Sequence, residues 1–342
     1  MQAFVALWTH RYRKSRYLVF SYATFAYYFI FFKLRKFFTG QQNVAILLAE
    51  QFGDIVACEP VSRYVRQQYP NEYLLWIVRK PFNELVRYNP SLDSIHLEYS
   101  VLESILHLKY HTFDILVNLH ISNRFAEFTR QRLVNPRADA LGITVFTYYF
   151  HGCLLEVFSE IAGLPRLKES PQVTIPAEIR QRIDALQLPA KYMVFHAQSN
   201  QASRNWRTEY WQKLANKLSI STDYQIVEVG LTPQLSVDTP QYRNLCGQLS
   251  LLETAEVIRR ASYFIGIDSG PAHFANAFGV YGFILLGKLA DFDAYIPYSG
   301  TYGNQTNAVL IREPNRACSE LPYDKVWEVV SERLHIQNHH SL

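Results

Sequence analysis

Cysteine is scarce in this sequence and shows no metal-binding arrangement. The 342 residues contain four cysteines, which are widely separated: Cys58, Cys153, Cys246 and Cys318. They form no Cys-x-x-Cys pair and no cluster with histidine at metal-ligand spacing. Such scattered thiols indicate reduced cysteines in a cytosolic protein and no structural zinc. His335, His339 and His340 could chelate a metal, but a solvated C-terminal tail is the simpler interpretation.

Several motifs of nucleotide-binding proteins and hydrolases are also missing. The absence of Gly-x-Gly-x-x-Gly leaves a nicotinamide-binding half unsupported, and the absence of Gly-x-x-x-x-Gly-Lys-[Ser/Thr] argues against an NTPase. Neither Gly-x-Ser-x-Gly nor His-Glu-x-x-His occurs. Asp291-Phe292-Asp293 spells an Asp-x-Asp triplet, which can hold Mg²⁺ against a sugar nucleotide. Because it lies in a late loop, a solvated acidic loop is the simpler interpretation.

Acidic residues are absent from the N-terminus. Residues 1–42 hold seven lysines and arginines, and the first carboxylate is Glu50. The other 300 residues carry 27 bases against 30 acids, so the net charge of +4 belongs to the N-terminus. A slightly acidic body argues against nucleic acid as the partner.

Aromatic residues crowd the same N-terminal segment, which holds fourteen of the fifty. The apolar run Tyr17–Phe32 lies between basic clusters, and its sixteen residues span about 24 Å as a helix, short of the roughly 30 Å hydrocarbon core. No signal-peptidase site follows it. Three interpretations remain: a helix at the membrane interface, a helix packed on the protein's own body, or a transmembrane anchor. A moderately polar face favours the interface; it consists of Tyr17, Ser21, Thr24 and Tyr28.

After Gly40, short apolar runs alternate with amphipathic stretches, which predicts parallel sheets covered on both faces. In the first half the predicted strands are Val44–Ala49, Tyr73–Val78 and Phe113–Leu119, and the predicted helices are Val56–Gln68 and Arg124–Leu133. In the second half the predicted strands are Tyr192–Ala197, Tyr224–Gly230, Ser262–Ile267 and Tyr281–Leu286, and the predicted helices are Trp206–Ser219, Leu251–Ala261 and Ala272–Ala277. A polar, proline-spaced linker at 165–176 separates the halves. The fold class is therefore α/β, with two doubly wound domains.

Three loops at the expected carboxyl ends of strands carry candidate chemistry. Asp54 follows the first strand at the start of a helix, where it either caps the helix or acts as a general base. In the second half, Asp268 to His273 (DSGPAH) joins a strand to a helix whose free N–H groups would suit phosphate. An ordinary capped junction between a strand and a helix, without a ligand, would have the same sequence pattern. The loop His196–Asn200, followed by Arg204, adds hydroxyl, amide and guanidinium donors.

These segments together resemble the heptosyltransferase family, glycosyltransferase family 9. Four stretches carry the resemblance: Phe52–Val56 with Pro60, Val194–Ala197 through Arg204-Asn205-Trp206, Phe113–Arg124, and most specifically Phe264–Val280 (FIGIDSGPAHFANAFGV). The match runs from about residue 43 to 335. It implies a GT-B fold, with two parallel-sheet domains facing a central cleft.

The resemblance implies an inverting, metal-independent transfer of heptose from ADP-heptose, with no cofactor, to a lipid-linked lipopolysaccharide core acceptor. Asp54 would be the catalytic base, and Arg204, where the family usually has lysine, would neutralise the diphosphate. The other implied donor-binding residues are Gln198, Ser199, Leu249, Asp268, Ser269, Gly270 and His273. Basic residues in the first half would suit a phosphorylated or carboxylated acceptor; these are Arg63, Arg79, Lys80 and Arg124.

Some positions depart from the family pattern and leave the donor open. Leu231-Thr232-Pro233-Gln234 follows Gly230 where the family commonly has a ribose-binding glutamate, and Glu228 stands before that glycine. A GT-B transferase using another nucleotide sugar for surface polysaccharide, or a non-catalytic nucleotide-sugar-binding protein, are the alternatives.

The sequence thus predicts four segments. Residues 1–42 form a membrane-surface segment, 43–170 an acceptor domain, 177–320 a donor domain, and 321–342 a helix folding back on the first domain, followed by a tail. We expect a cytoplasmic enzyme, peripheral to the inner face of the bacterial inner membrane, that contacts anionic lipid through residues 1–40.

Overall fold

The computed structural model describes residues 2–237 and 240–336, which divide into two compact units. The first unit contains the chain up to Gln51, Val61–His151 and Glu156–Leu167. The second contains Phe52–Pro60, Gly152–Leu155 and the chain from Lys168 onward. The stretch 165–176 has no regular secondary structure. His339 and His340 lie outside the described residues.

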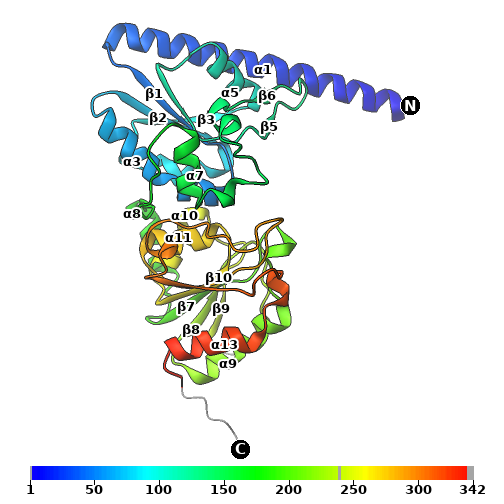
Figure 1. Ribbon diagram of the computed structural model, residues 1–342, viewed down its shortest axis with the longest axis vertical. Helices are drawn as coiled ribbons and strands as arrows, with labels where there is room; N and C mark the ends of the chain where they lie inside the picture. Colours follow the sequence, from blue (N-terminus) through cyan, green and yellow to red (C-terminus); the bar gives the residue numbers. More distant parts are fainter. Residues whose placement is uncertain (1, 238–239, 337–342) are drawn as a thin grey trace, which may run out of the picture. The chain divides into compact units, whose positions relative to one another are not determined.

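The first unit is built on a four-stranded parallel sheet in the order β3-β2-β1-β4 (Figure 1). Its strands are β1 (Asn43–Leu47), β2 (Tyr73–Arg79), β3 (Ser94–Glu98) and β4 (Ile115–Asn118). The helices in or entering this part of the chain are α1 (Gln2–Thr39), α3 (Glu59–Gln68), α4 (Glu84–Arg87), α5 (Val101–Lys109), α6 (Pro136–Ala140) and α7 (Leu154–Ile161). Every residue of β1 is buried, as expected of a central strand covered on both faces.

The first unit differs from the sequence prediction in several elements, including the helices α4 to α7, which were not predicted. The predicted helix Arg124–Leu133 is wrong, because its ends form the antiparallel strands β5 (Arg124–Phe125) and β6 (Arg132–Leu133). Ala126 packs against α5 while the Arg124 side chain is held by Glu98, so tertiary contacts override the helical pattern. The sequence also missed β3, whose residues are mostly only half-buried.

The second unit contains a six-stranded parallel sheet in the order β12-β11-β10-β7-β8-β9. Its strands are β7 (Tyr192–His196), β8 (Gln225–Glu228), β9 (Tyr242–Asn244), β10 (Tyr263–Ile267), β11 (Tyr281–Leu285) and β12 (Ala308–Ile311). Its helices are α2 (Phe52–Ala57), α8 (Ala177–Ala185), α9 (Thr208–Ser221), α10 (Leu251–Arg259), α11 (Gly270–Phe278), α12 (Gly300–Gly303) and α13 (Tyr323–Arg333). The predicted strand and helix positions of this half are reproduced to within a few residues.

Helix α13 belongs to the second unit, which corrects the expectation that it folds back on the first domain. Val326 and Val330 are fully buried in the core that α13 shares with α9 and β12. The indole Nε1 of Trp206 donates to the carbonyl of Leu321 at 2.8 Å, just before the helix. The apolar face of α13 therefore completes one layer over the second sheet.

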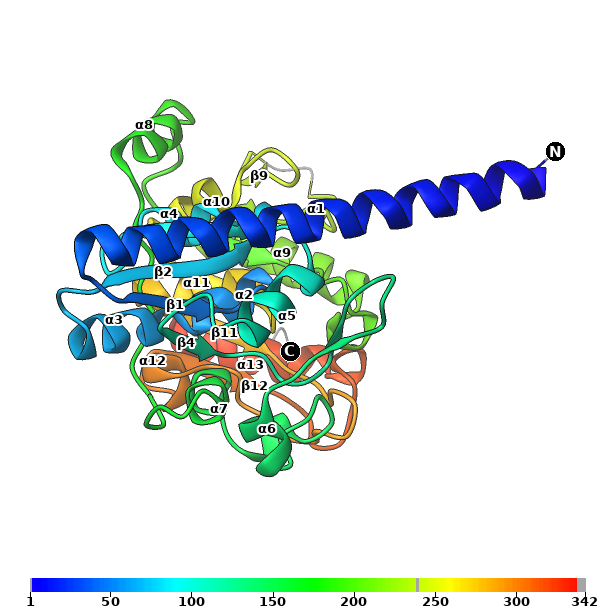
Figure 2. The same cartoon turned by 90° about the horizontal axis from the view of Figure 1, so that it is seen from above.

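Helix α1 is a single helix of 38 residues that packs on α5 within the first unit (Figure 2). One stripe faces the body: Ser21 and Phe32 are buried, and Tyr17, Phe25 and Tyr28 are half-buried. The polar face that the sequence placed at a membrane interface is thus directed at the protein itself. Among the described residues, one helical stretch, the 36 residues Phe4–Thr39, is long and apolar enough to cross a membrane; an 18-residue window of it has a mean hydropathy of 1.3 and is 11% buried.

Candidate active site

The N-terminus of α11 lies at the carboxyl end of β10 and carries no side-chain cap. Ser269 occupies the N-cap position, but its hydroxyl donates to the carbonyl of Ile267 at 3.1 Å and lies 3.0 Å from Nδ1 of His196. Pro271 sits in the first turn, where its missing N–H costs nothing. An uncapped helix start with its positive dipole end is a site for phosphate.

Arg204 is held beside this helix start by a buried carboxylate. Its guanidinium Nη1 lies 3.3 Å from Oδ2 of Asp268 and donates to the Asp268 carbonyl at 3.4 Å. The hydroxyls of Tyr295 and Tyr298 donate to the two carboxylate oxygens of Asp268, at 2.8 and 3.1 Å. Asp268, only 2% exposed, therefore positions a cation next to the phosphate-type site. The sequence reasoning missed both tyrosines, because no pattern in the chain ties them to Asp268.

Asp54 belongs to the second unit, because its short helix α2 packs on α11. The rings of Phe52 and Phe274 stack with centroids 5.5 Å apart. A β-carbon at Gly53 would lie 3.3 Å from the ring of His273 and 3.4 Å from the α-carbon of Gly270. The start of α2, with Asp54 in its first turn, is thus in van der Waals contact with the start of α11.

Two histidines of this site are buried and neutral. Burial lowers the pKa of both His196 and His273 to about 4, and the nearby charge of Asp268 only partly offsets this at His273. Nδ1 of His273 has no hydrogen-bond partner among the described residues, although the side chain is only 3% exposed. An unsatisfied buried nitrogen costs about 1–3 kcal/mol, so it is a natural place for a ligand contact.

The remaining predicted donor residues lie in loops of the same unit. Oε1 of Gln198 accepts from Thr232 and Gln234, both at 2.9 Å, which ties the loop after β7 to the loop after β8. The amide N–H of Ser199 donates to Oδ1 of Asn205 at 2.8 Å. Leu249 is half-buried immediately before α10.

The buried carboxylate of Glu228 makes hydrogen bonds within the protein. Its carboxylate accepts from the backbone N–H of Gln234 at 2.7 Å and from the Tyr242 hydroxyl at 2.5 Å, and the residue is 1% exposed. Glu228 therefore shapes the loop that follows Gly230. In the Asp-x-Asp triplet, Asp293 pairs with Lys288 at 2.8 Å on the surface.

The predicted acceptor residues lie in the first unit. Arg79 ends β2, Lys80 follows it, and Arg63 is half-buried on α3. Arg124 makes a bidentate ion pair with Glu98 at 2.9 and 2.6 Å, so this guanidinium is already committed.

A polar network that the sequence did not indicate surrounds Arg124. Nε2 of His120 accepts from the Ala49 amide at 3.0 Å, and its Nδ1 lies 2.9 Å from Glu50. Burial raises the pKa of Glu50, but the hydrogen bond and charge of His120, with Arg124 and Arg79, lower it overall. The carboxyl edge of this sheet is therefore polar and rigidly hydrogen-bonded.

Two parallel-sheet α/β units, one with a helix start suited to phosphate beside an arginine and a carboxylate, are typical of proteins that bind nucleotide sugars. The family model for glycosyltransferase family 9 (heptosyltransferase) matches residues 154–283, which contain that helix start. The lipopolysaccharide core heptosyltransferase OpsX of Haemophilus influenzae is 22% identical over 335 residues, covering 84% of this chain and 91% of the relative.

Solved structures share the fold. A glycosyltransferase of family 9 from Veillonella parvula superposes with a TM-score of 0.65 at 15% identity, covering 86% of this chain and 97% of the other. The ADP-heptose lipopolysaccharide heptosyltransferase II of Escherichia coli gives 0.61 at 16% identity, covering 86% and 98%. The predicted GT-B fold is confirmed by these structures, and the family 9 match at residues 154–283 supports a glycosyltransferase.

Proposed function

We propose that this glycosyltransferase moves heptose from ADP-heptose to a saccharide of the lipopolysaccharide core, with inversion and without a metal ion at the reacting centre. Relatives named as core heptosyltransferase and as ADP-heptose transferase support this substrate class. The observation that carries the mechanism is the position of Asp54 on α2, packed against the uncapped start of α11.

In the proposed step Asp54 is the general base. Its carboxylate takes the proton of the acceptor hydroxyl while that oxygen bonds to the anomeric carbon of the donor sugar. The bond from this carbon to the diphosphate oxygen breaks with its electron pair, so ADP leaves from the opposite face and the configuration inverts. A positioned base of this kind contributes typically 10²–10⁴-fold.

The charge that develops on the diphosphate needs fixed positive partners. Arg204 is one, oriented by Asp268. The second positive partner is the start of α11, with Ser269 and Gly270. The neutral His273, whose Nδ1 has no hydrogen-bond partner among the described residues, would add a third contact to the diphosphate. Arginine and a helix dipole supply here what a metal ion supplies in other transferases. Gln198 and Ser199 would complete the phosphate contacts, and Leu249 would pack on the base.

The acceptor contacts are assigned to the first unit. Arg79 and Lys80, at the carboxyl end of β2, would bind an acidic group of the core saccharide. Arg63 would add a third charge. Arg124 would act through its ion pair with Glu98, which keeps this edge of the sheet in place.

Asp54→Asn tests the mechanism. We expect kcat to fall by about 10²–10⁴-fold because the amide cannot accept the proton, while ADP affinity measured by calorimetry stays within twofold. The matched control is Asp324→Asn, which alters an exposed acid in the first turn of α13. A helix-capping role alone would instead lower the unfolding free energy by about 0.5–2 kcal/mol and leave turnover intact, and that outcome would reject the base.

A panel of donors tests the substrate. We expect turnover with ADP-heptose on a lipopolysaccharide core acceptor and much less with GDP- and UDP-sugars. A second candidate is a transferase that uses another nucleotide sugar. It is favoured because Glu228 is buried and internally bonded and the four residues after Gly230, Leu231 to Gln234, include no carboxylate for a ribose. Turnover with a different donor alone would establish it, and binding without any turnover would indicate a non-catalytic protein.

We further propose that α1 lies on the anionic inner face of the cytoplasmic membrane and brings the enzyme to a lipid-linked acceptor. Its inner stripe is occupied: the hydroxyls of Ser21 and Ser100 lie 2.7 Å apart, and the Tyr17 hydroxyl accepts from the Glu127 amide at 3.3 Å. A helix held along its length in this way favours lying on the surface over crossing it.

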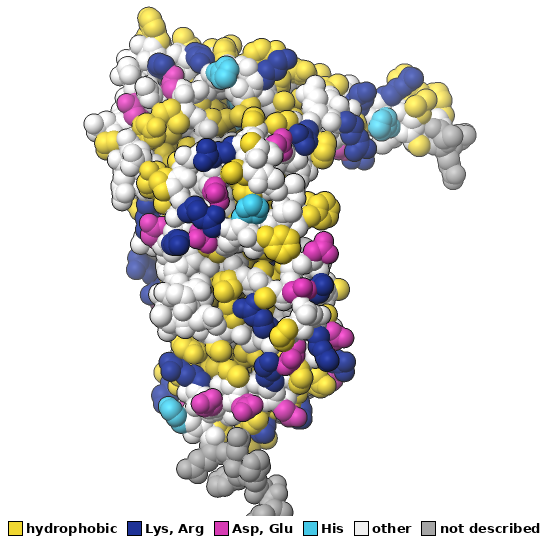
Figure 3. Space-filling view, in the orientation of Figure 1, with side chains coloured by type: hydrophobic (Ala, Val, Ile, Leu, Met, Phe, Trp, Pro, Cys, Tyr) yellow, Lys and Arg dark blue, Asp and Glu magenta, His cyan; other side chains and the backbone are white. Residues whose placement is uncertain are grey.

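The outward face of α1 is apolar and aromatic, with basic side chains interspersed (Figure 3). Its exposed members include Phe20, Tyr27, Ile30, Phe31, Leu34, Phe37 and Phe38. Aromatic rings suit the headgroup boundary, and lysine or arginine contributes about 1 kcal/mol each near anionic lipid. Arg11, Lys14 and Arg16 are exposed on this helix.

Vesicle sedimentation tests the membrane proposal. We expect Phe31→Ser with Phe38→Ser to weaken binding to phosphatidylglycerol vesicles at least about 100-fold, since each buried phenylalanine contributes about 1.5–3 kcal/mol. Phe146→Ser with Phe150→Ser, two exposed phenylalanines outside α1, is the control. Unchanged binding of the α1 variant would place the membrane contact elsewhere.

A further inference from the structure

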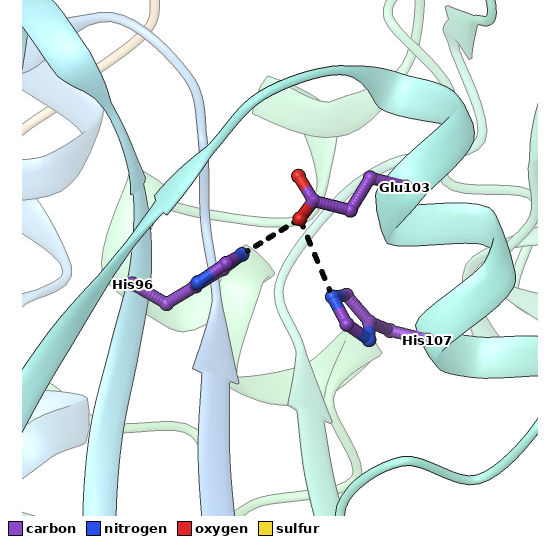
Figure 4. A group of neighbouring side chains, drawn as sticks. All are labelled: His96, Glu103 and His107. Carbon is purple, nitrogen blue, oxygen red and sulfur yellow. Dashed lines mark ion pairs between the residues drawn. The ribbon is translucent and has the colours of Figure 1, made fainter. Parts of the chain in front are cut away.

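A cluster of three potential metal ligands is buried in the first unit. His96 projects from β3, and Glu103 and His107 project from one face of α5, four residues apart (Figure 4). Oε1 of Glu103 lies 3.2 Å from Nε2 of His96 and 3.7 Å from Nε2 of His107. All three ligand atoms lie within 4.8 Å of one another.

The cluster is sealed from solvent and its inner atoms are unsatisfied. The three side chains are at most 2% exposed. Oε1 of Glu103, Nε2 of His107 and both ring nitrogens of His96 have no hydrogen-bond partner among the described residues. Their contacts are with one another, as ion pairs of Glu103 with His96 at 3.2 Å and with His107 at 3.7 Å, and a buried polar group without a hydrogen bond costs about 1–3 kcal/mol. A shared occupant that binds these atoms together would remove most of that cost.

The outer atoms of Glu103 and His107 are hydrogen-bonded, which orients the inner atoms of these two side chains. Nδ1 of His107 lies 2.9 Å from the hydroxyl of Thr112. Oε2 of Glu103 accepts from the amide of Tyr99 at 2.7 Å. Metal-ligating histidines and carboxylates are oriented by outer hydrogen bonds of this kind.

We propose that His96, Glu103 and His107 bind one Zn²⁺ ion, which fastens α5 to β3. Two imidazoles and one carboxylate are a donor set that zinc uses, and a tetrahedral site with bonds of about 2.0–2.2 Å spaces its ligand atoms by roughly 3.3 Å. The 3.2 and 3.7 Å separations suit that geometry with small adjustments. Water would complete the coordination.

The role of this ion is structural, because the site lies beneath the part of α1 that packs on the first unit. The ring of Tyr28 contacts that of His96 edge-on at 4.0 Å, and the ring of Phe25 lies 5.4 Å from that of His107. The ligands are thus covered by the inner stripe of α1 and remote in sequence from the donor-site residues of the second unit. The proposal departs from the expectation of no structural zinc, because the three ligands lie on two elements and form no compact motif.

Metal analysis of the full-length chain tests the proposal. After treatment with a chelator and dialysis against zinc chloride, we expect one zinc per chain by mass spectrometry. We expect affinity to fall at least about 100-fold in His96→Gln and in His107→Gln. A chain lacking residues 335–342 is the control, because it removes the histidine-rich tail and leaves the cluster intact.

Two further readouts keep the test decisive if a ligand variant folds poorly. Thr112→Val leaves all three ligands but releases Nδ1 of His107, so we expect zinc affinity to fall about 10–100-fold. Hydrogen exchange of Tyr17–Phe32 should rise when zinc is removed from the parent protein. No bound zinc, zinc lost with the tail, or zinc retained in His96→Gln would each overturn the proposal.

Discussion

Gly270 has no room for a side chain where α2 meets α11. A β-carbon there would lie 1.8 Å from the ring of Phe52. We expect Gly270→Ala to lower the unfolding free energy by about 1–3 kcal/mol because the ring must be displaced, and to weaken ADP binding. Urea unfolding and calorimetry measure the two effects.

A compensating variant checks the cause of that loss. Phe52→Ala removes the ring that the new methyl group would strike, so the double variant should recover part of the stability lost in Gly270→Ala. Additive losses in the double variant would contradict the steric explanation.

At the scale of single residues, sequence reasoning found the side chains that lie next to strand ends and helix starts. Sequence reasoning placed Asp54 after a strand of one sheet and Ser269 and His273 after a strand of the other, and the packing of α2 on α11 brings the start of α2 to His273. It missed Tyr295 and Tyr298, which reach Asp268 from a loop without regular structure. It predicted a donor contact for Asp268 and did not foresee that this carboxylate also lies 3.3 Å from the guanidinium of Arg204. Such contacts depend on loop geometry that no local pattern encodes.

Among the elements, α13 is a required part of the second unit. Trp327 is 7% exposed, and the ammonium of Lys217 on α9 lies 3.9 Å from its ring centroid. We expect Trp327→Ala to cost about 3–5 kcal/mol of unfolding free energy through the cavity it leaves. Glu328→Ala, on the exposed face of the same helix, should stay within about 0.5 kcal/mol. Equal urea midpoints for both variants would refute this packing.

The sequence predicted the strands whose residues are almost completely buried and missed the strand whose residues are only partly buried. The strands β1, β7 and β10 are apolar runs almost wholly buried, so their composition identified them. The half-buried edge strand β3 carries too weak a signal. The 124–133 region is held by an ion pair and a short hairpin, which a helical pattern of apolar residues cannot reveal.

For the whole molecule, acid should be destabilising from about pH 6.5 downward. In the unfolded chain, histidines accept protons near that pH, whereas His196 and His273 in the folded protein stay neutral until about pH 4. The unfolded state therefore binds more protons between these values, and each histidine removes on the order of 1–3 kcal/mol of stability across the window.

Urea unfolding between pH 7.5 and 4.5 measures this dependence. The slope should be steepest below pH 6.5 and should flatten when His196 or His273 is replaced by glutamine. A free energy of unfolding that is constant over this range would contradict the buried, neutral state of these two histidines.

The whole-molecule charge was also informative, because the basic surplus of the N-terminus coincides with α1. The sequence could not predict which face of that helix packs on the protein. Its polar residues, Tyr17, Ser21 and Tyr28, could equally face water or the protein, and only contacts with Ser100 and His96 decide between the two.

The membership of α2 in the second unit has a consequence for modularity. The chain leaves the first unit after Gln51, returns at Val61, and crosses again at Gly152, Glu156 and Lys168. No single cut therefore separates two complete halves. A chimera joined at the linker near 165–176 would graft a foreign α2, with its counterpart of Asp54, onto the resident α11. An exchange of N-terminal halves between relatives should therefore succeed only when the residue at position 52 and the residue at position 270 come from the same parent, because the Phe52 ring leaves no room for a side chain at Gly270.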